Sequence, residues 1–373
     1  MTTRSTLHLS PPAGADPDLP KHAVFAECLE RQLRRGQPGK RLPPMRSLMR
    51  AFGISQSTLD QALRRLEADG LIIRRRGSGI FIAPRRRRAA PRPAVGVLVS
   101  DLDDPFCALL VKGIERELAA RRRLAVICNG QRQFQTELER LHSLRGNIDG
   151  AIINPTTTNV RNPDYVRYFT DLARHRPFPF LLVDIPIPSV PAAFIGFDNR
   201  AAFFDMAGVL AGSRARGRRI YYVGAPDCVV GAARLSGFKA GLQKHRIPGD
   251  ALTVVPVALP IAAASMAVLD ARRWEPPAIL VAASPLLVPK LLAICAGLGW
   301  RLPDDVLIAA VVEENFRDAV PVPVAAWVKP SVRLGEYAAG LIQDLIDGRP
   351  GQRPRRLPLA RAIPNTLRAL LNL

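Results

Sequence analysis

Apolar residues between positions 21 and 84 recur at helical spacing. The third of three such stretches is the clearest, because its apolar positions follow the i, i+3, i+4, i+7 pattern of one helix face: Leu59, Ala62, Leu63 and Leu66. Gly70 ends this stretch, and two short apolar runs, 71–73 and 80–82, surround the turn RRRGSG. The pattern predicts an α+β unit over 21–84, a helix–turn–helix with a two-stranded wing, preceded by a flexible tail at 1–20.

From position 94 the pattern changes to short continuous apolar runs that alternate with helical stretches. Nine runs stand out: 95–99, 124–128, 149–153, 179–183, 194–197, 219–223, 252–256, 278–282 and 306–312. Continuous apolar strands separated by helices are typical of parallel strands that are buried on both faces. Segment 94–373 contains more of them than one such sheet needs. We therefore expect a two-lobed α/β domain with Rossmann-like lobes and parallel sheets.

The segment between these two parts, 85–93, reads RRRRAAPRP. Four adjacent arginines do not pack in a core, and prolines stiffen the chain, so we interpret it as a linker. It is either a solvated tether or an additional contact to phosphate groups. The formal net charge is +21, and within residues 1–93 basic residues outnumber acidic ones by 19 to 7. This charge density favours a polyanionic partner, although a general arginine bias of the chain contributes to it.

Several classes of function lack their usual sequence signals. The five cysteines form no CxxC and the five histidines have no metal-ligand spacing, so we expect reduced thiols, a cytoplasmic protein, and no metal or cofactor. The most apolar stretch, 278–300, is interrupted by two prolines and a lysine, which argues against a membrane span. No nucleophile elbow, phosphate loop or HExxH is present. We therefore do not expect an enzyme. The competing class is a DNA-binding regulator fused to an aminotransferase-like domain, and such a domain would need a cofactor-binding lysine within a recognisable motif.

Short polar residues open the third helix of the N-terminal unit, where a helix in the major groove would meet base edges and phosphates. Basic residues ahead of the second helix, and small residues at the wing tip, could contact the DNA backbone and the minor groove. The predicted DNA-binding residues are Lys40, Arg41, Arg46, Ser55, Gln56, Ser57, Thr58, Gln61, Gly77, Ser78 and Gly79. The alternative is that Ser55 only caps the helix and the others form a solvated face.

Three short segments of this unit resemble the winged helix of the GntR family of bacterial regulators: LPPMR (42–46), ISQSTLD (54–60) and GSG (77–79). The resemblance implies a fold that binds duplex DNA. The chain departs from the family where a Ser–Glu pair is replaced by Pro44 and Met45. Gln56 and Asp60 replace two arginines of the family's recognition helix, which implies a different operator preference.

Segment 94–373 resembles the effector domain shared by LacI-type regulators and periplasmic sugar-binding proteins. The matching segments, in order, are VGVLVSDLDDPF (95–106), NIDGAIINP (147–155), FIGFDNRAA (194–202), GAARLSGFKAGL (231–242) and LPDDVLIAAVVEE (302–314). Carried over to this chain, the resemblance implies an effector site formed by Asp101, Asp103, Phe106, Thr156, Asn199, Arg234 and Glu313. The alternatives are a surface ion pair for Arg234 and ordinary core packing for Phe106.

Two polar pairs that the resemblance places around the ligand are changed in this chain. One falls on Val312 and Glu313, so only one carboxylate remains, and the other falls on Ala283 and Ser284. These departures allow an effector that is less polar than a plain sugar, or differently charged.

Together, these patterns predict a cytoplasmic, DNA-binding transcription regulator, and a repressor in the first instance. We expect a homodimer on a palindromic double-stranded operator, whose affinity is controlled by a small sugar-like metabolite between two lobes. The alternative is a DNA-binding regulator with a degenerate sensor that no longer binds ligand. The effector, the operator and the sign of regulation stay open.

Overall fold

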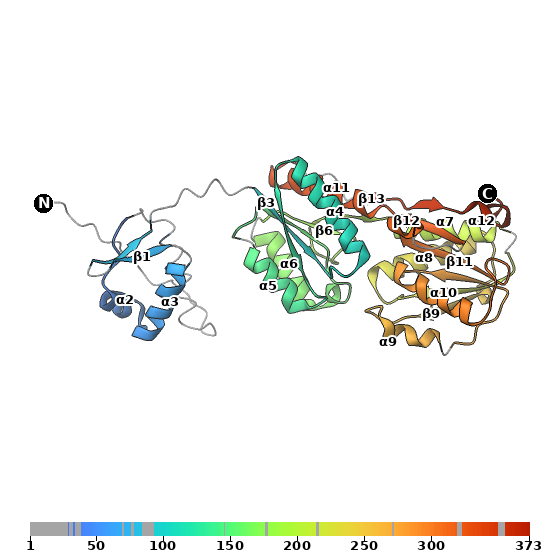
Figure 1. Cartoon of the computed structure of the whole chain (residues 1–373), viewed down its shortest axis with the longest axis horizontal. Helices are drawn as coiled ribbons and strands as arrows, with labels where there is room; N and C mark the ends of the chain where they lie inside the picture. The colour runs from blue at the N-terminus through green and yellow to red at the C-terminus, as the bar shows by residue number, and fades with distance from the viewer. Residues whose placement is uncertain are drawn as a thin grey trace. The chain divides into compact units, whose positions relative to one another are not determined.

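The computed structural model describes residues 29, 33, 39–68, 71–75, 78–83, 93–144, 146–175, 178–213, 216–270, 272–318, 323–349 and 355–373. The chain divides into two compact units, Met1–Pro91 and Arg92–Leu373 (Figure 1). The predicted tail at 1–20, the predicted linker except Pro93, and the predicted wing residue Gly77 lie outside the described residues.

The smaller unit contains the predicted helices and wing. Its elements are α2 (Met45–Phe52), α3 (Gln56–Ala68), β1 (Ile72–Arg75) and β2 (Gly79–Ile82), and the two strands pair antiparallel. Gly53 ends α2 with φ of 60°, a left-handed conformation that glycine adopts without steric cost. The apolar face of α3 is buried as its spacing predicts, because Leu59 and Leu63 are both 0% exposed. Leu29 and Leu33, the described part of the predicted first helix, are helical and belong to the same core.

The first lobe of the larger unit is built on a fully parallel sheet with strand order β13-β7-β6-β5-β3-β4. The strands are β3 (Ala94–Val99), β4 (Leu124–Asn129), β5 (Gly150–Ile153), β6 (Phe180–Val183), β7 (Ala193–Phe197) and β13 (Arg355–Leu357). The helices are α4 (Pro105–Ala120), α5 (Phe134–Leu144), η1 (Asn159–Arg161), α6 (Pro163–His175) and α11 (Ser331–Ile346).

Helices cover both faces of this sheet. Side chains of α4 and α11 share one hydrophobic cluster with the sheet, and those of α5 and α6 share the other. Helices α4 and α11 approach closely at two glycines, since a Cβ added to Gly113 would lie 1.9 Å from the carbonyl oxygen of Val332. A Cβ at Gly335 would lie 2.2 Å from the Leu110 carbonyl oxygen, so neither position accepts a larger residue without moving a helix.

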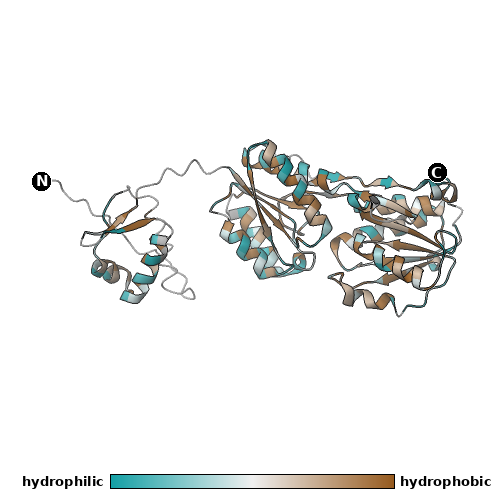
Figure 2. Ribbon diagram, in the orientation of Figure 1, coloured by the Kyte–Doolittle hydropathy of each residue, from teal (hydrophilic) through white to brown (hydrophobic). Residues whose placement is uncertain are grey.

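The second lobe repeats this layered design, with strand order β14-β12-β11-β10-β8-β9. Its strands are β8 (Arg219–Gly224), β9 (Leu252–Pro256), β10 (Ala278–Ala282), β11 (Val306–Glu313), β12 (Val324–Lys329) and β14 (Ala360–Ala362). Its helices are α7 (Asn199–Ala211), α8 (Val229–Lys244), η2 (Gly249–Ala251), α9 (Ala263–Met266), η3 (Ala267–Leu269), η4 (Pro285–Leu287), α10 (Val288–Gly297), η5 (Glu314–Asp318) and α12 (Asn365–Leu371). In both lobes the strands carry the hydrophobic colours and the covering helices are mixed (Figure 2).

Each of the nine apolar runs lies on one of the strands β3 to β11, as predicted. The expectation of wholly parallel sheets was wrong at one edge, because β14 pairs antiparallel with β12. Strands β12, β13 and β14 were not predicted. The last two have three residues each, too few for an alternating or continuous apolar pattern, and they exist because neighbouring strands offer them backbone partners.

The chain passes between the lobes three times. It crosses after β7, returns between β12 and α11, and crosses again between β13 and β14. The carboxyl ends of the parallel strands in both lobes therefore face the region between the lobes, the usual place of a ligand site in open α/β sheets.

Candidate functional site

The start of α3 presents polar side chains to solvent. Ser55 caps the helix, since its Oγ accepts a hydrogen bond from the Thr58 backbone N–H at 3.3 Å. The same Oγ lies 2.9 Å from Ser57 Oγ and 2.8 Å from Thr58 Oγ1. Gln56, Ser57 and Gln61 are exposed and Thr58 is half-buried. Ser57 and Gln61 thus lie on the side of α3 opposite its buried leucines, and Gln56 is exposed at the first turn. Ser55 also has the capping role of the alternative interpretation.

The predicted backbone contacts lie near the wing. Arg41 forms an isolated β-bridge to Phe81, and a Cβ added to Gly79 would lie 2.8 Å from Arg41 Nε, so Arg41 and the wing tip are neighbours. Gly79 has φ of +108°, which favours glycine there. Ser78 and Arg46 are exposed and Lys40 is half-buried. Asp60, which stands in place of a family arginine, lies 3.6 Å from Arg74.

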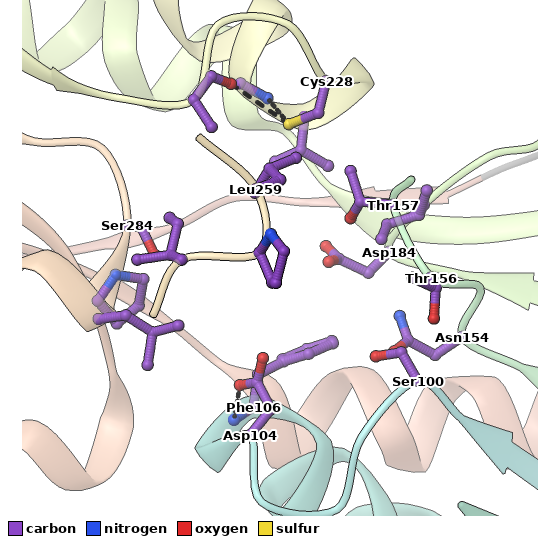
Figure 3. Close-up of a pocket in the computed structure, with 18 of the residues that line it drawn as sticks. Ser100, Asp104, Phe106, Asn154, Thr156, Thr157, Asp184, Cys228, Leu259 and Ser284 are labelled. Carbon is purple, nitrogen blue, oxygen red and sulfur yellow. Dashed lines mark hydrogen bonds between the residues drawn. The ribbon is translucent and has the colours of Figure 1, made fainter. Parts of the chain in front are cut away.

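The larger unit contains a cavity of about 230 Å³ that is lined by residues of both lobes (Figure 3). Four of the seven predicted effector residues line it: Phe106, Thr156, Arg234 and Glu313. Ser284, where the resemblance places a polar residue beside the ligand, also lines the cavity. Polar lining residues that the sequence did not single out are Ser100, Asp104, Arg132, Asn154, Thr157, Thr158, Asp184 and Lys329. Asp101, Asp103 and Asn199 lie outside the lining.

Arg234 on α8 is held in place by two hydrogen bonds and is 7% exposed. Its Nε donates to Asn199 Oδ1 at 2.8 Å, and its Nη1 donates to the Ala283 carbonyl oxygen at 2.6 Å. Asn199 itself is buried. No described residue accepts from Nη2, so the guanidinium is oriented with donor capacity left for a ligand.

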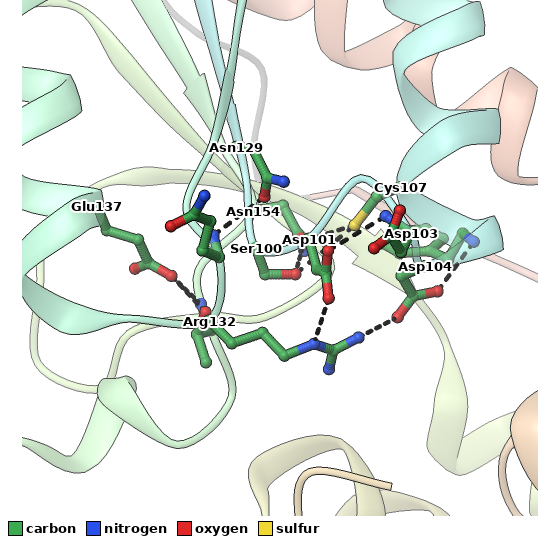
Figure 4. A network of polar contacts seen from close by, with 12 residues as sticks. Ser100, Asp101, Asp103, Asp104, Cys107, Asn129, Arg132, Glu137 and Asn154 are labelled. Atoms are coloured by element: carbon green, nitrogen blue, oxygen red, sulfur yellow. Dashed lines mark hydrogen bonds and ion pairs between the residues drawn. The ribbon is translucent and has the colours of Figure 1, made fainter. Parts of the chain in front are cut away.

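The predicted aspartates Asp101 and Asp103 belong to a polar network at the start of α4 (Figure 4). Arg132 Nε donates to Asp101 Oδ2 at 2.8 Å, and this hydrogen bond lowers the pKa of Asp101. Arg132 also lies 3.5 Å from Asp104, which caps α4 by accepting from the Phe106 N–H at 3.0 Å. Asp103 is exposed. Arg132 and Asp104 also line the cavity.

Glu313 and Phe106 are both in contact with Lys329, which the sequence analysis missed. Lys329 Nζ lies 2.7 Å from Glu313 Oε1 and 3.8 Å from the centroid of the Phe106 ring. Glu313 Oε2 also accepts from Ser331 Oγ at 2.5 Å. The side chains of the ion pair are each 5% exposed. Glu313 is therefore neutralised within the protein, and one face of the Phe106 ring is occupied by a cation.

Thr156 is held in place by hydrogen bonds to the buried carboxylate of Glu137. Thr156 Oγ1 and its N–H both donate to Glu137 Oε1, and the Tyr165 hydroxyl donates to Glu137 Oε2 at 2.5 Å. Burial raises the pKa of Glu137, and the hydrogen bonds from Thr156 and Tyr165 oppose that rise. This arrangement holds the loop that follows β5 against the cavity.

Asp184 combines three unusual features directly after β6. Its φ is +64°, a left-handed value that is uncommon for a residue other than glycine. Its Oδ1 is buried with no hydrogen-bond partner. Burial raises the pKa of Asp184, and the positive charges of Lys329 and Arg234 oppose that rise. A strained, unpartnered carboxylate in a cavity is a strong candidate for ligand binding.

We expect Asp184→Asn to stabilise the ligand-free protein. A raised pKa means that stability falls as pH rises from the ordinary value of 3.8 through the raised value, because the buried carboxylate must then be charged. Asparagine tolerates the left-handed conformation and removes that charge. At neutral pH the free energy of unfolding should rise by about 1 kcal/mol, which corresponds to a melting temperature higher by roughly 2–4 °C. In acid, where the carboxyl group is protonated, the two proteins should melt at the same temperature. Calorimetry that finds no increase at neutral pH would contradict this account, and ligand affinity should fall in the same variant.

Comparison with known proteins identifies both parts of the chain. Residues 24–82 match the family model of bacterial regulatory proteins of the gntR family. Residues 213–365 match the model of the periplasmic binding protein-like domain. The chain joins a GntR-type helix–turn–helix domain to a periplasmic-binding-protein-like domain. The predicted fold class is thereby confirmed.

One curated relative extends over most of the chain, and solved structures match about three quarters of it. The arabinose metabolism transcriptional repressor of Geobacillus stearothermophilus is 24% identical over 341 residues, which is 89% of this chain and 92% of the relative. A LacI family transcriptional regulator from Enterococcus faecium, solved with bound ribose, has a TM-score of 0.60 at 21% identity. It covers 72% of this chain and 96% of its own. The transcription regulator CcpA of Lactococcus lactis has a TM-score of 0.59 at 16% identity, with 74% and 98% covered.

Two negative observations apply to the described residues of both domains. No helix among them is long and apolar enough to span a membrane. They also contain no group of three or more His, Cys, Asp or Glu side chains arranged to hold a metal ion.

Some of the cavity residues that the sequence analysis missed could have been found from their positions in the sequence of the periplasmic-binding-protein-like domain. Asp184 follows the apolar run FLLV, and Asn154 follows GAII, so both stand at carboxyl ends of strands. Polar residues at strand ends border the ligand cleft of open α/β sheets, so this position alone could have selected Asp184 and Asn154. Lys329 had no such signal, because β12 itself was not predicted.

Proposed function

We propose that this protein is a transcriptional repressor that releases its operator when a small metabolite, a sugar or related compound, binds between the lobes. The observation that carries the proposal is the cavity itself, where Asp184 and Arg234 retain hydrogen-bonding capacity that the protein does not use. The names of the relatives, repressors of arabinose metabolism and a regulator solved with ribose, support the same reading.

The GntR-type domain would supply the contact to double-stranded DNA through the exposed start of α3 and the wing. A cytoplasmic homodimer on a palindromic operator would place two such domains on successive half-sites. A ligand that favours one arrangement of the lobes would change operator affinity only by its preference for that arrangement, typically about 1–3 kcal/mol. We assign no catalytic activity to the chain.

A degenerate sensor is the competing proposal, and Lys329 is the observation in its favour, because it already occupies one face of Phe106. The remaining cavity of about 230 Å³ and the unpartnered Asp184 count against it. In a pocket that no longer binds a ligand, we would expect every buried polar atom to have a hydrogen-bond partner within the protein.

Operator release tests the proposal. The full chain is titrated onto fluorescent operator DNA at fixed salt, and the anisotropy is measured with and without a panel of small metabolites. We expect at least one compound to weaken operator binding by about 5–150-fold, the range of ordinary allosteric coupling. Thermal shifts with the same panel show whether a compound binds. A panel in which compounds bind but none changes operator affinity would refute the regulatory proposal.

A further inference from the structure

The cavity between the lobes has one polar wall and one aliphatic wall. The first lobe contributes hydroxyl, amide and carboxylate groups, among them Ser100, Thr157 and Asp184. The second lobe contributes an aliphatic surface from the loop residues Leu259–Ile261 after β9 and from Pro285 and Leu286 of the short helix η4 after β10. Figure 3 shows this division, with Leu259 and Ser284 on one side and Asp184, Thr156 and Ser100 on the other.

Core packing accounts for Ile261, which packs against the core of the second lobe, but not for the two leucines of the aliphatic wall. Leu259 and Leu286 are half-buried, and neither belongs to any hydrophobic cluster formed by the described residues. Leu287, the next residue, is 0% exposed and lies in the core of the second lobe. Leu259 and Leu286 therefore present apolar surface to the cavity, and a ligand that covers this surface gains from its removal from water.

The charged groups of the second lobe do not make up for this. Glu313 and Lys329 neutralise each other, so the polar groups on that side that can meet a ligand are Arg234, the Ser284 hydroxyl and the N–H groups of Lys329 that do not face Glu313. The polar positions expected from the resemblance in the sequence are partly lost to Ala283. A sugar hydroxyl that faced Leu259 or Leu286 would lose its water without gaining a partner, which disfavours a fully hydroxylated ligand.

We propose that the ligand is a deoxy sugar, a single sugar ring with a methyl group. Its hydroxyl groups face Asp184 and Arg234, and its methyl group rests on the aliphatic wall of Leu259 and Leu286. This inference rests on the proposed function and specifies the ligand of that site. The cavity of about 230 Å³ is below the roughly 300–1,000 Å³ usual for larger ligands, which fits one ring.

Matched sugars test the methyl group alone. L-Arabinose, D-fucose and D-galactose share one ring configuration and carry hydrogen, methyl or hydroxymethyl at C5. D-Xylose, D-quinovose and D-glucose form a second such series, and D-lyxose, D-rhamnose and D-mannose a third. Binding to the full chain is measured by calorimetry. In at least one series we expect the methyl sugar to bind at least tenfold more tightly than the hydroxymethyl sugar.

Variants show whether the aliphatic wall causes this preference. Leu259→Asn and Leu286→Asn, each outside the core clusters, should reduce the preference for methyl to less than threefold. Leu298→Asn is the matched control, because Leu298 is 53% exposed and does not line the cavity, and it should keep the preference. Melting temperatures of all three variants show that the domain is folded.

Three results would overturn the inference: equal or tighter binding of the hydroxymethyl sugar in every series, no binding of any of these sugars, or an unchanged preference in both wall variants. Failure of the proposed function has a different signature. In that case the methyl sugar binds with the expected preference, yet operator affinity measured by anisotropy stays constant at saturating sugar.

Discussion

Replacing Arg234 by alanine is expected to raise the Kd for the effector by about 100-fold and to abolish operator release at wild-type effector concentrations. Hydrogen bonds from a charged donor contribute about 1.5–3 kcal/mol when the partner is otherwise unpaired, and 2.8 kcal/mol corresponds to 100-fold. Asn199 and the Ala283 carbonyl oxygen already orient the guanidinium, so little of this energy is spent on ordering the side chain. Calorimetry gives the Kd, and anisotropy gives operator release.

The matched control for this prediction is Arg301→Ala. Arg301 lies in the same lobe, is exposed and forms an ion pair with Asp305 at 2.9 Å, so the control removes the same charge away from the cavity. Operator binding without effector should be unchanged in both variants. If Arg234→Ala still released the operator at wild-type effector concentrations, Arg234 would not be a ligand contact.

Replacing both Gln56 and Gln61 by alanine is expected to remove most discrimination between operator and random DNA. Both side chains are exposed on α3 and long enough to reach base edges, and a good base contact is worth about 1–3 kcal/mol. Two such contacts sum to about 2–6 kcal/mol, so the double variant should bind its operator about 30–20,000-fold more weakly. Ser55 and its capping bond to Thr58 are untouched, so the helix should remain folded. Competition anisotropy against scrambled DNA measures the loss.

Lys40→Ala is the informative contrast, because a lysine that contacts phosphate weakens binding to all sequences alike and reduces the salt slope by about 1. An unchanged ratio of operator to random binding in the glutamine double variant would show that α3 does not read bases. A uniform loss in that variant, with the salt slope reduced, would make α3 a phosphate contact instead.

The elements that the sequence predicts well are those whose pattern is local. Leu59 and Leu63 are spaced at the helical period, so the sequence of this segment alone is enough to predict which helix face is buried. The strands from β3 to β11 were found for the same reason, since each is a continuous apolar run. Strand β14 was not found, because its three residues carry no pattern of their own and form a strand only by pairing with the neighbouring β12.

The pocket shows the limit of the same reasoning. Arg234 could be proposed because it stands in a segment that resembles a known effector domain, and Thr156 because it directly follows one. Both line the cavity. The contact of Lys329 with Glu313 and Phe106 joins three segments far apart in the chain, so no spacing rule reveals it. The left-handed backbone of Asp184 is likewise a property of its surroundings in the folded domain.

The triple passage of the chain between the lobes makes each lobe a discontinuous piece of polypeptide. Along the chain, helix α11 and strand β13 of the first lobe come after most elements of the second lobe. Strand β14, which follows them, forms one edge of the sheet of the second lobe. A deletion that starts at Arg355 therefore strips an edge strand from both sheets at once. Neither lobe can therefore be obtained alone by shortening the chain from one end. Expression of a single lobe would require a gene in which its separate segments are permuted or rejoined.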